Sequence, residues 1–164
     1  MKKLAILFLI TVIFTGCIKQ NTPATTEKVK PEDKAVLTLM SDLLVSLATG
    51  DPELQKKVWH QSPSLLVAGI YENAEFFGWD EFDKHLKSAS ERLKNVNFDV
   101  SCREWRISES NRTAWFLLIV NQEYELDGKS FKIENMRYTG VAEKIGGNWK
   151  ITMFHGSVPV KVAS

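Results

Sequence analysis

The stretch that decides the fold lies near the end of the chain, at Gly146–Ser157, and reads GGNWKITMFHGS. Two glycines followed by an asparagine are typical of a tight hairpin turn, because glycine adopts positive φ values without steric cost. Apolar and polar residues then alternate from Trp149 to His155, which predicts a β-strand. A histidine at the end of that strand raises the question whether His155 takes part in chemistry or only completes a sheet.

Alternation of apolar residues predicts three more long strands upstream of this one. Residues 98–107 alternate with a phase slip at residues 103–104, which indicates a β-bulge. Residues 113–124 are apolar on both faces through WFLLIV, as in a central strand that is covered on both sides. Asp127-Gly128 is a hairpin turn into residues 131–144, so the second half of the chain is predicted to be a four-stranded meander.

Two helices are predicted at the start of the folded part. Pro31 suits the first turn of a helix, where its missing N–H loses no hydrogen bond, and Gly50 is a typical C-terminal cap. Apolar residues recur between them at spacings of three and four, so this helix is amphipathic. Asp51 followed by Pro52 begins a short second helix that carries Trp59 inward.

A short strand and a third helix are predicted before the meander. Residues 64–70 (SLLVAGI) are typical of a strand, and residues 71–77 of its short return. Gly78 begins a helix in which four apolar residues share one face. His85 stands beside this apolar stripe, and we interpret it as a solvated or flanking histidine.

The first 20 residues, MKKLAILFLITVIFTGCIKQ, have the organisation of an export signal. Two lysines precede an apolar run that is shorter than the roughly 20 residues of a membrane-spanning helix. The run ends in Phe14-Thr15-Gly16-Cys17, which resembles the bacterial lipobox, with Phe14 at the place usually held by Leu. We expect lipidation of Cys17 after removal of residues 1–16, and hence an anchor in a membrane of the bacterial cell envelope. A plain secretory signal and an uncleaved anchor are the alternatives.

The remaining composition is that of one exported globular domain. Residues 17–30 are rich in Thr, Lys and Pro and are predicted to be a flexible tether, followed by a domain over residues 31–160. The 164 residues are 44% hydrophobic and 25% charged, and their formal charge is +1. Such neutrality gives no electrostatic footprint for nucleic acid, so no nucleic-acid partner is expected. With Cys17 lipidated, Cys102 has no partner for an internal disulfide.

This order of elements resembles the SnoaL-like branch of the NTF2-like superfamily, also called the ketosteroid-isomerase-like fold. The C-terminal strand is also similar to that of the calmodulin-dependent kinase II association domain, which has a similar Trp-to-His-x-Ser ending. The resemblance implies an α+β fold in which three N-terminal helices pack on a strongly curved, mostly antiparallel sheet, with a pocket inside the cone and a homodimer formed by the sheet. The matching residues are Trp59, Gly78, Ala114, Trp115, Arg137, Thr139, Val141, Gly147, Trp149, Ile151, His155 and Ser157.

The last hairpin assigns residues to the two faces of the sheet. A three-residue loop would pair Ile145 with Trp149 and Thr139 with His155, whereas a two-residue turn would shift the pairing by one. The three-residue loop predicts two sets of side chains. The sheet-face or interface candidates are Arg137, Trp149 and His155, and the pocket candidates are Glu134, Tyr138 and Phe154, joined by Trp59 and Tyr71. The kinase association domain has pocket arginines at the places of Gly140 and Gly156, so the resemblance implies that this chain lacks those countercharges.

The sequence contains no complete catalytic set. Glu134, Tyr138 and His155 are the candidates, but Glu134 and Tyr138 are about 13 Å apart along a strand, which is too far for action on one carbon. Arg137 near His155 would lower the basicity of the imidazole, so we interpret His155 as a residue that packs at a sheet end or dimer interface. His60, His85 and His155 show no metal-ligand spacing, and no phosphate-binding or nucleophile motif is present, so neither metal nor cofactor is expected.

The predicted function follows from an anchored domain without a complete catalytic set. We expect a membrane-anchored lipoprotein whose domain is a non-catalytic dimeric module that binds a small hydrophobic ligand or a protein partner. The first alternative is a cofactor-independent enzyme of the isomerase or dehydratase type, acting on a small hydrophobic substrate in the cone. The second alternative is a structural self-assembly module.

Overall fold

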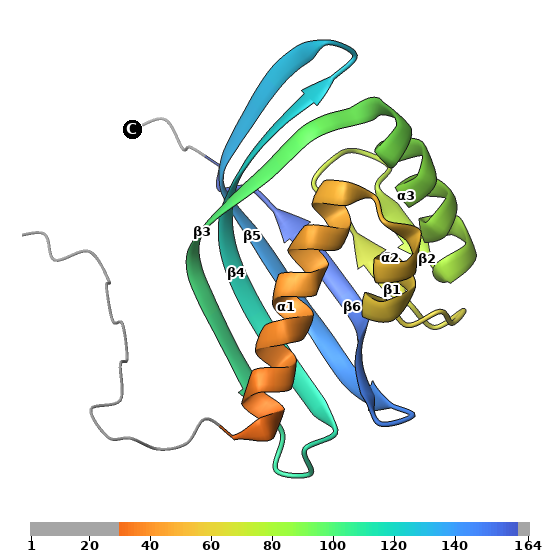
Figure 1. The fold of residues 1–164 in the computed structure, drawn as a ribbon, viewed down its shortest axis with the longest axis vertical. Helices are drawn as coiled ribbons and strands as arrows, with labels where there is room; N and C mark the ends of the chain where they lie inside the picture. Colours follow the sequence, from red (N-terminus) through yellow and green to blue (C-terminus); the bar gives the residue numbers. More distant parts are fainter. Residues whose placement is uncertain (1–29, 161–164) are drawn as a thin grey trace, which may run out of the picture.

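Three helices lie on one face of a curved six-stranded sheet in the computed structural model, which describes residues 30–160 (Figure 1). Neighbouring strands follow the order β2-β1-β6-β5-β4-β3, and all pair antiparallel except β1 with β6. The elements are α1 (Pro31–Thr49), α2 (Pro52–Val58), β1 (Leu66–Ala68), β2 (Glu75–Phe77), α3 (Trp79–Arg92), β3 (Leu93–Ile107), β4 (Thr113–Leu126), β5 (Lys129–Ile145) and β6 (Asn148–Ser157). The predicted α+β cone is confirmed. The predicted signal peptide, Cys17 and most of the tether lie outside the described residues.

Helix α1 is held across the sheet by the two carboxylates of its first turn. The Trp149 indole donates to Glu32 Oε2 at 3.0 Å, and Lys144 Nζ lies 2.6 Å from Glu32 Oε1. The Trp105 indole donates to Asp33 Oδ1 at 2.9 Å. Two acidic residues that favour a helix N-terminus for local reasons therefore also join α1 to strands β3, β5 and β6.

The last hairpin differs from the predicted one at its turn and agrees with it at its end. Gly146 and Gly147 form a two-residue loop with φ values of 57° and 85°, so Ile145 pairs with Asn148, not with Trp149. A bulge at Thr152 then adds one residue to β6, and Thr139 pairs with His155 as predicted. Because one extra residue reverses the alternation, Trp149 lies on the buried face and His155 on the outer face.

Bulges in β3 and β5 also differ from the predicted pattern. The slip in β3 falls at Ser101 and not at residues 103–104, since Val100 pairs with Val120 and Cys102 with Ile119. In β5 the slip lies beside Asn135, whose φ is 56° and whose N–H donates to Asn121 Oδ1 at 3.0 Å. Each bulge moves the following side chains to the opposite face.

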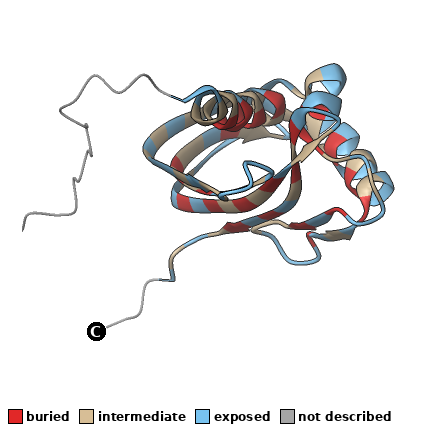
Figure 2. Cartoon of the chain, turned by 90° about the horizontal axis from the view of Figure 1, so that it is seen from below, coloured by how far each residue is buried: buried red, intermediate tan, exposed pale blue. Residues whose placement is uncertain are grey.

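The core lies between the helices and the concave face of the sheet. Buried and exposed residues alternate along the strands (Figure 2). In β4 the inward side chains of Phe116 and Leu118 are buried, whereas the outward Trp115 is 50% exposed. The expectation that β4 is covered on both faces therefore fails within residues 30–160, where only the inner face is covered. None of the helices among these residues is long and apolar enough to span a membrane.

Candidate functional site: a cavity inside the cone

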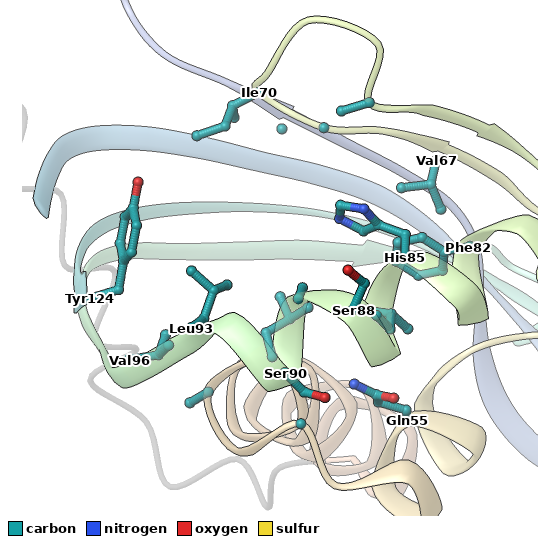
Figure 3. A pocket seen from close by; sticks show the side chains of 18 of the residues that line it. Gln55, Val67, Ile70, Phe82, His85, Ser88, Ser90, Leu93, Val96 and Tyr124 are labelled. Carbon is teal, nitrogen blue, oxygen red and sulfur yellow. The ribbon is translucent and has the colours of Figure 1, made fainter. Parts of the chain in front are cut away.

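A cavity of about 420 Å³ is lined by α3, the β1–β2 turn, the inner face of the sheet, the end of α1 and α2 (Figure 3). Its volume is in the range typical of small-molecule pockets, about 300–1,000 Å³. Val67 and Ile70 approach it from β1 and the turn that follows, and His85, Ser88 and Leu93 approach it from α3 and the start of β3. The cavity is thus built from segments far apart in the sequence, brought together by the curvature of the sheet.

Aromatic side chains form much of the cavity wall. Trp59 is fully buried and packs edge-on against Phe82 and Phe154, with ring centroids 4.8 and 5.5 Å away. The Tyr138 ring lies 5.0 Å from that of Phe154. All four residues line the cavity. Such edge-to-face packing favours a rigid apolar wall.

Two tyrosines join across the cavity. The hydroxyls of Tyr71 and Tyr124 are 2.6 Å apart and hydrogen-bonded, which ties the β1–β2 turn to strand β4. The turn is itself closed by the Gly69 N–H, which donates to the Ala74 carbonyl at 2.8 Å. Burial, and then the hydrogen bond shared with Tyr124, raise the pKa of Tyr71 far above its usual value, so the Tyr71 hydroxyl is neutral at physiological pH.

His85 is an exposed residue of α3, in agreement with its interpretation as a solvated or flanking histidine, but one side of its ring also lines the cavity. Its ring lies 4.6 Å from the ring of Phe76 and stacks on Phe82 at 6.3 Å, and it lines the cavity. Burial lowers the pKa of His85 below 6.5, which favours the neutral imidazole. The signal was present in the sequence, because His85 follows Phe82 by three residues and so shares its helix face.

The cavity lining is nearly uncharged. No aspartate or glutamate is among the described residues that line it, and Arg92, at its edge, is paired with Asp127 at 2.8 Å. Burial raises the pKa of Tyr138, keeping that phenol protonated. The polar groups available to a ligand are therefore neutral hydroxyl, imidazole and amide groups.

The predicted site residues fall into two groups in space. Trp59, Tyr71, Tyr138 and Phe154 line the cavity. Glu134 does not, because the bulge beside Asn135 leaves it exposed, 3.6 Å from Lys132 Nζ.

The interface candidates are likewise divided between the two faces. Arg137 and His155 are exposed on the outer face, where His155 Nδ1 lies 3.5 Å from Thr139 Oγ1. Trp149 is on the inner face, only 7% exposed and bonded to Glu32, which corrects its predicted place beside His155. The catalytic candidates Glu134, Tyr138 and His155 are therefore not brought together. Within the described part of the chain, no group of three or more His, Cys, Asp or Glu side chains is placed to hold a metal ion.

Gly140 and Gly156, where the resemblance implies pocket arginines in the kinase association domain, differ in their surroundings. Gly156 lines the cavity, and a Cβ there would lie 3.0 Å from Ile70 Cγ2. Gly140 lies under the ring of Phe116 and does not line the cavity. Of the two arginines that the resemblance leads us to expect, only the one at position 156 would have lain in the cavity wall.

Comparison with known proteins agrees with this architecture. A family model described as a SnoaL-like domain matches residues 36–161. Comparison with curated proteins finds no match.

Solved structures similar to this chain include three with different descriptions. An NTF2-like superfamily protein from Salmonella enterica is 17% identical, with a TM-score of 0.70, covering 80% of this chain and 94% of that chain. A Xanthomonas campestris protein provisionally assigned as a calcium/calmodulin-dependent protein kinase II association domain is 19% identical, with a TM-score of 0.67, covering 84% and 95%. A Novosphingobium aromaticivorans protein provisionally assigned as a scytalone dehydratase is 16% identical, with a TM-score of 0.68, covering 81% and 95%.

At these identities the likeness to solved structures shows the fold alone, whereas the family model covers most of the chain. Both comparisons are consistent with the α+β fold described above. The chain therefore belongs to the SnoaL-like domain family and has the NTF2-like fold.

Proposed function

We propose that this chain is a lipoprotein of the bacterial cell envelope whose SnoaL-like domain binds a small, mostly apolar molecule in the cone cavity without converting it. The observation that carries the proposal is the cavity itself, about 420 Å³ in volume, with aromatic walls and neutral polar groups. Such a site offers a large favourable burial of apolar surface to a ligand that fits it.

The lining favours binding over catalysis of the ketosteroid isomerase kind. That chemistry uses a carboxylate as general base beside oxyanion donors. Here Tyr138 could supply a donor, but the described lining residues include no aspartate or glutamate, and Glu134 faces solvent. A cavity that has donors but no carboxylate base is suited to holding a neutral ligand.

The binding proposal is tested with the full chain carrying Cys17→Ser, which removes the lipid anchor and leaves the domain intact. Native mass spectrometry and a crystal structure of the purified protein would look for a copurified molecule, and calorimetry would measure the binding of naphthalene as an apolar probe. Density in the cone or saturable naphthalene binding supports the proposal. A crystal structure in which side chains fill the cone, with no heat of naphthalene binding, would overturn it.

The anchor is proposed from the lipobox-like residues Phe14–Cys17 and is tested in the native host. Two or three acyl chains hold a protein on a membrane far more firmly than one. Wild-type protein is therefore expected in the membrane fraction, and Cys17→Ser protein in the soluble envelope fraction. Unchanged membrane partitioning of a processed Cys17→Ser protein would contradict lipidation.

The second candidate function is an isomerase or dehydratase type of enzyme, and His85 is the observation that favours it. An imidazole that lines an apolar cavity, and whose pKa is lowered by partial burial, is a suitable general base even though part of the His85 side chain is exposed, and the Tyr71 and Tyr138 hydroxyls line the same cavity. Extracts of the host would be incubated with wild-type protein and with a His85→Ala variant, and compared by mass spectrometry. A compound consumed by wild type and spared by His85→Ala would replace the binding proposal with this one.

A further inference from the structure

Gln55 is a buried polar residue on the wall of the cavity. It is 3% exposed, it lies in α2, and its backbone carbonyl accepts from the Trp59 N–H at 2.9 Å. No hydrogen bond to another residue of 30–160 engages its side-chain amide, which lines the cavity beside α1 and α2 (Figure 3). A glutamine in this position faces the cavity and not the protein.

An amide that opens into a cavity becomes costly only when a ligand covers it without forming hydrogen bonds to it. Covering an unpaired polar group with apolar atoms is unfavourable, and a leucine or methionine of similar size would pack there without that cost. In the empty cavity, water can satisfy the amide, and a ligand that displaces that water loses affinity unless it replaces the hydrogen bonds. The buried amide therefore selects among apolar ligands by their polar group.

We propose that Gln55 forms a polar subsite for an otherwise apolar ligand. Its side chain would hydrogen-bond to an uncharged group that has a donor and an acceptor side by side, such as a carboxamide. The glutamine amide presents one carbonyl oxygen as acceptor and one NH₂ as donor, which complements such a group. This inference rests on the proposed function, because it assigns a ligand class to the same cavity.

The charges around the cavity exclude ionised ligand groups. A carboxylate would need a countercharge, and the Arg92 guanidinium at the edge of the lining is already paired with Asp127. An ammonium would need an acidic partner, and the described lining residues provide none. Burying either ion without a partner is strongly unfavourable.

The subsite is tested with three probes that share one ring system: naphthalene, 2-naphthamide and 2-naphthoate. Calorimetry would measure their dissociation constants with the full chain carrying Cys17→Ser, alone and combined with Gln55→Leu. Gln122→Leu is the matched control, because Gln122 also lines the cavity but from strand β4 and with more exposure. Urea unfolding of each variant confirms that it folds.

We expect 2-naphthamide to bind the parent protein about three- to tenfold more tightly than naphthalene, the effect of about one net hydrogen bond. Gln55→Leu should abolish that preference while leaving the affinity for naphthalene equal or higher, Gln122→Leu should keep it, and 2-naphthoate should bind most weakly. An amide preference that survives in Gln55→Leu would overturn the subsite and leave the proposed function standing. Failure of all three probes to bind the parent would overturn both.

Discussion

Replacing Gly140 by alanine is expected to destabilise the domain, whereas the same change at Gly156 is not. A Cβ at Gly140 would lie 2.5 and 2.7 Å from two ring carbons of Phe116 and 2.8 Å from the Met153 carbonyl oxygen. The Phe116 side chain is only 4% exposed, and the Met153 carbonyl belongs to strand β6, so neither can move freely. At Gly156 the nearest atom is the Cγ2 methyl of Ile70 at 3.0 Å, and a shift of a few tenths of an ångström in this single side chain relieves the contact.

The magnitude follows from two opposing effects. Overpacking of a core typically costs about 1–3 kcal/mol, while alanine stabilises a strand over glycine by roughly 0.5–1 kcal/mol through chain entropy. The entropic gain is common to Gly140→Ala and Gly156→Ala, so the difference between the two variants isolates the steric cost. With a urea m-value of about 1–3 kcal/mol/M, a difference of about 2 kcal/mol separates the midpoints by roughly 1 M.

Urea unfolding followed by tryptophan fluorescence measures this difference, and naphthalene binding gives a second, opposite result. Gly156→Ala adds a methyl group to the cavity wall and is expected to weaken naphthalene binding. Gly140→Ala lies outside the lining and is expected to leave that affinity unchanged. Equal urea midpoints for the two variants, with equal m-values, would refute the packing argument.

Three further predictions concern other parts of the molecule. Hydrogen bonds from Lys144 and then Trp149 lower the pKa of Glu32. The stability that the ionised carboxylate contributes is therefore present above pH 4.5 and is lost as the pH falls through the lower pKa of the folded state. Glu32→Gln should flatten the decline of the urea midpoint in acid, and an unchanged decline would contradict this. Burial lowers the pKa of His85, so its NMR titration should have a midpoint below 6.5. The free energy of unfolding should fall as the pH drops below 6.5, because the unfolded state binds the proton more readily. A midpoint at or above 6.5 would show a solvated ring. The homodimer that the resemblance implies should use the outer sheet face, where Trp115 is 50% exposed, so Trp115→Glu should give a monomer in sedimentation. A wild-type monomer at high concentration would rule out the dimer.

The order of the elements was predictable because it depends on local patterns. Pro31 begins α1 and Gly50, with a φ of 67°, ends it, and Gly78 caps α3. The Asp127-Gly128 turn joins β4 to β5 as predicted. In each case the residue type restricts the backbone at its own position, so no distant contact is needed to place the element.

The candidate site was predictable only where alternation continued without interruption. Tyr138 and Phe154 line the cavity because both follow the bulges beside Asn135 and at Thr152, in a stretch where β5 and β6 pair without a further slip, and the expected faces hold there. Glu134 and Trp149 were misplaced because bulges beside Asn135 and at Thr152 each reverse the alternation. A bulge leaves little trace in composition, because it needs only one extra residue in one of two paired strands.

By itself, the sequence determined the elements, their order and the family to which the chain belongs, because periodicity, caps and turns act through neighbouring residues. The tertiary structure alone decided which side chains meet: Glu32 with Trp149 across 117 positions, Tyr71 with Tyr124 across 53, and Gln55 with an open cavity. It also decided that His155 completes the outer face of the sheet while His85 lines the cavity. These contacts depend on bulges and sheet curvature, which are properties of the paired strands and not of any single segment.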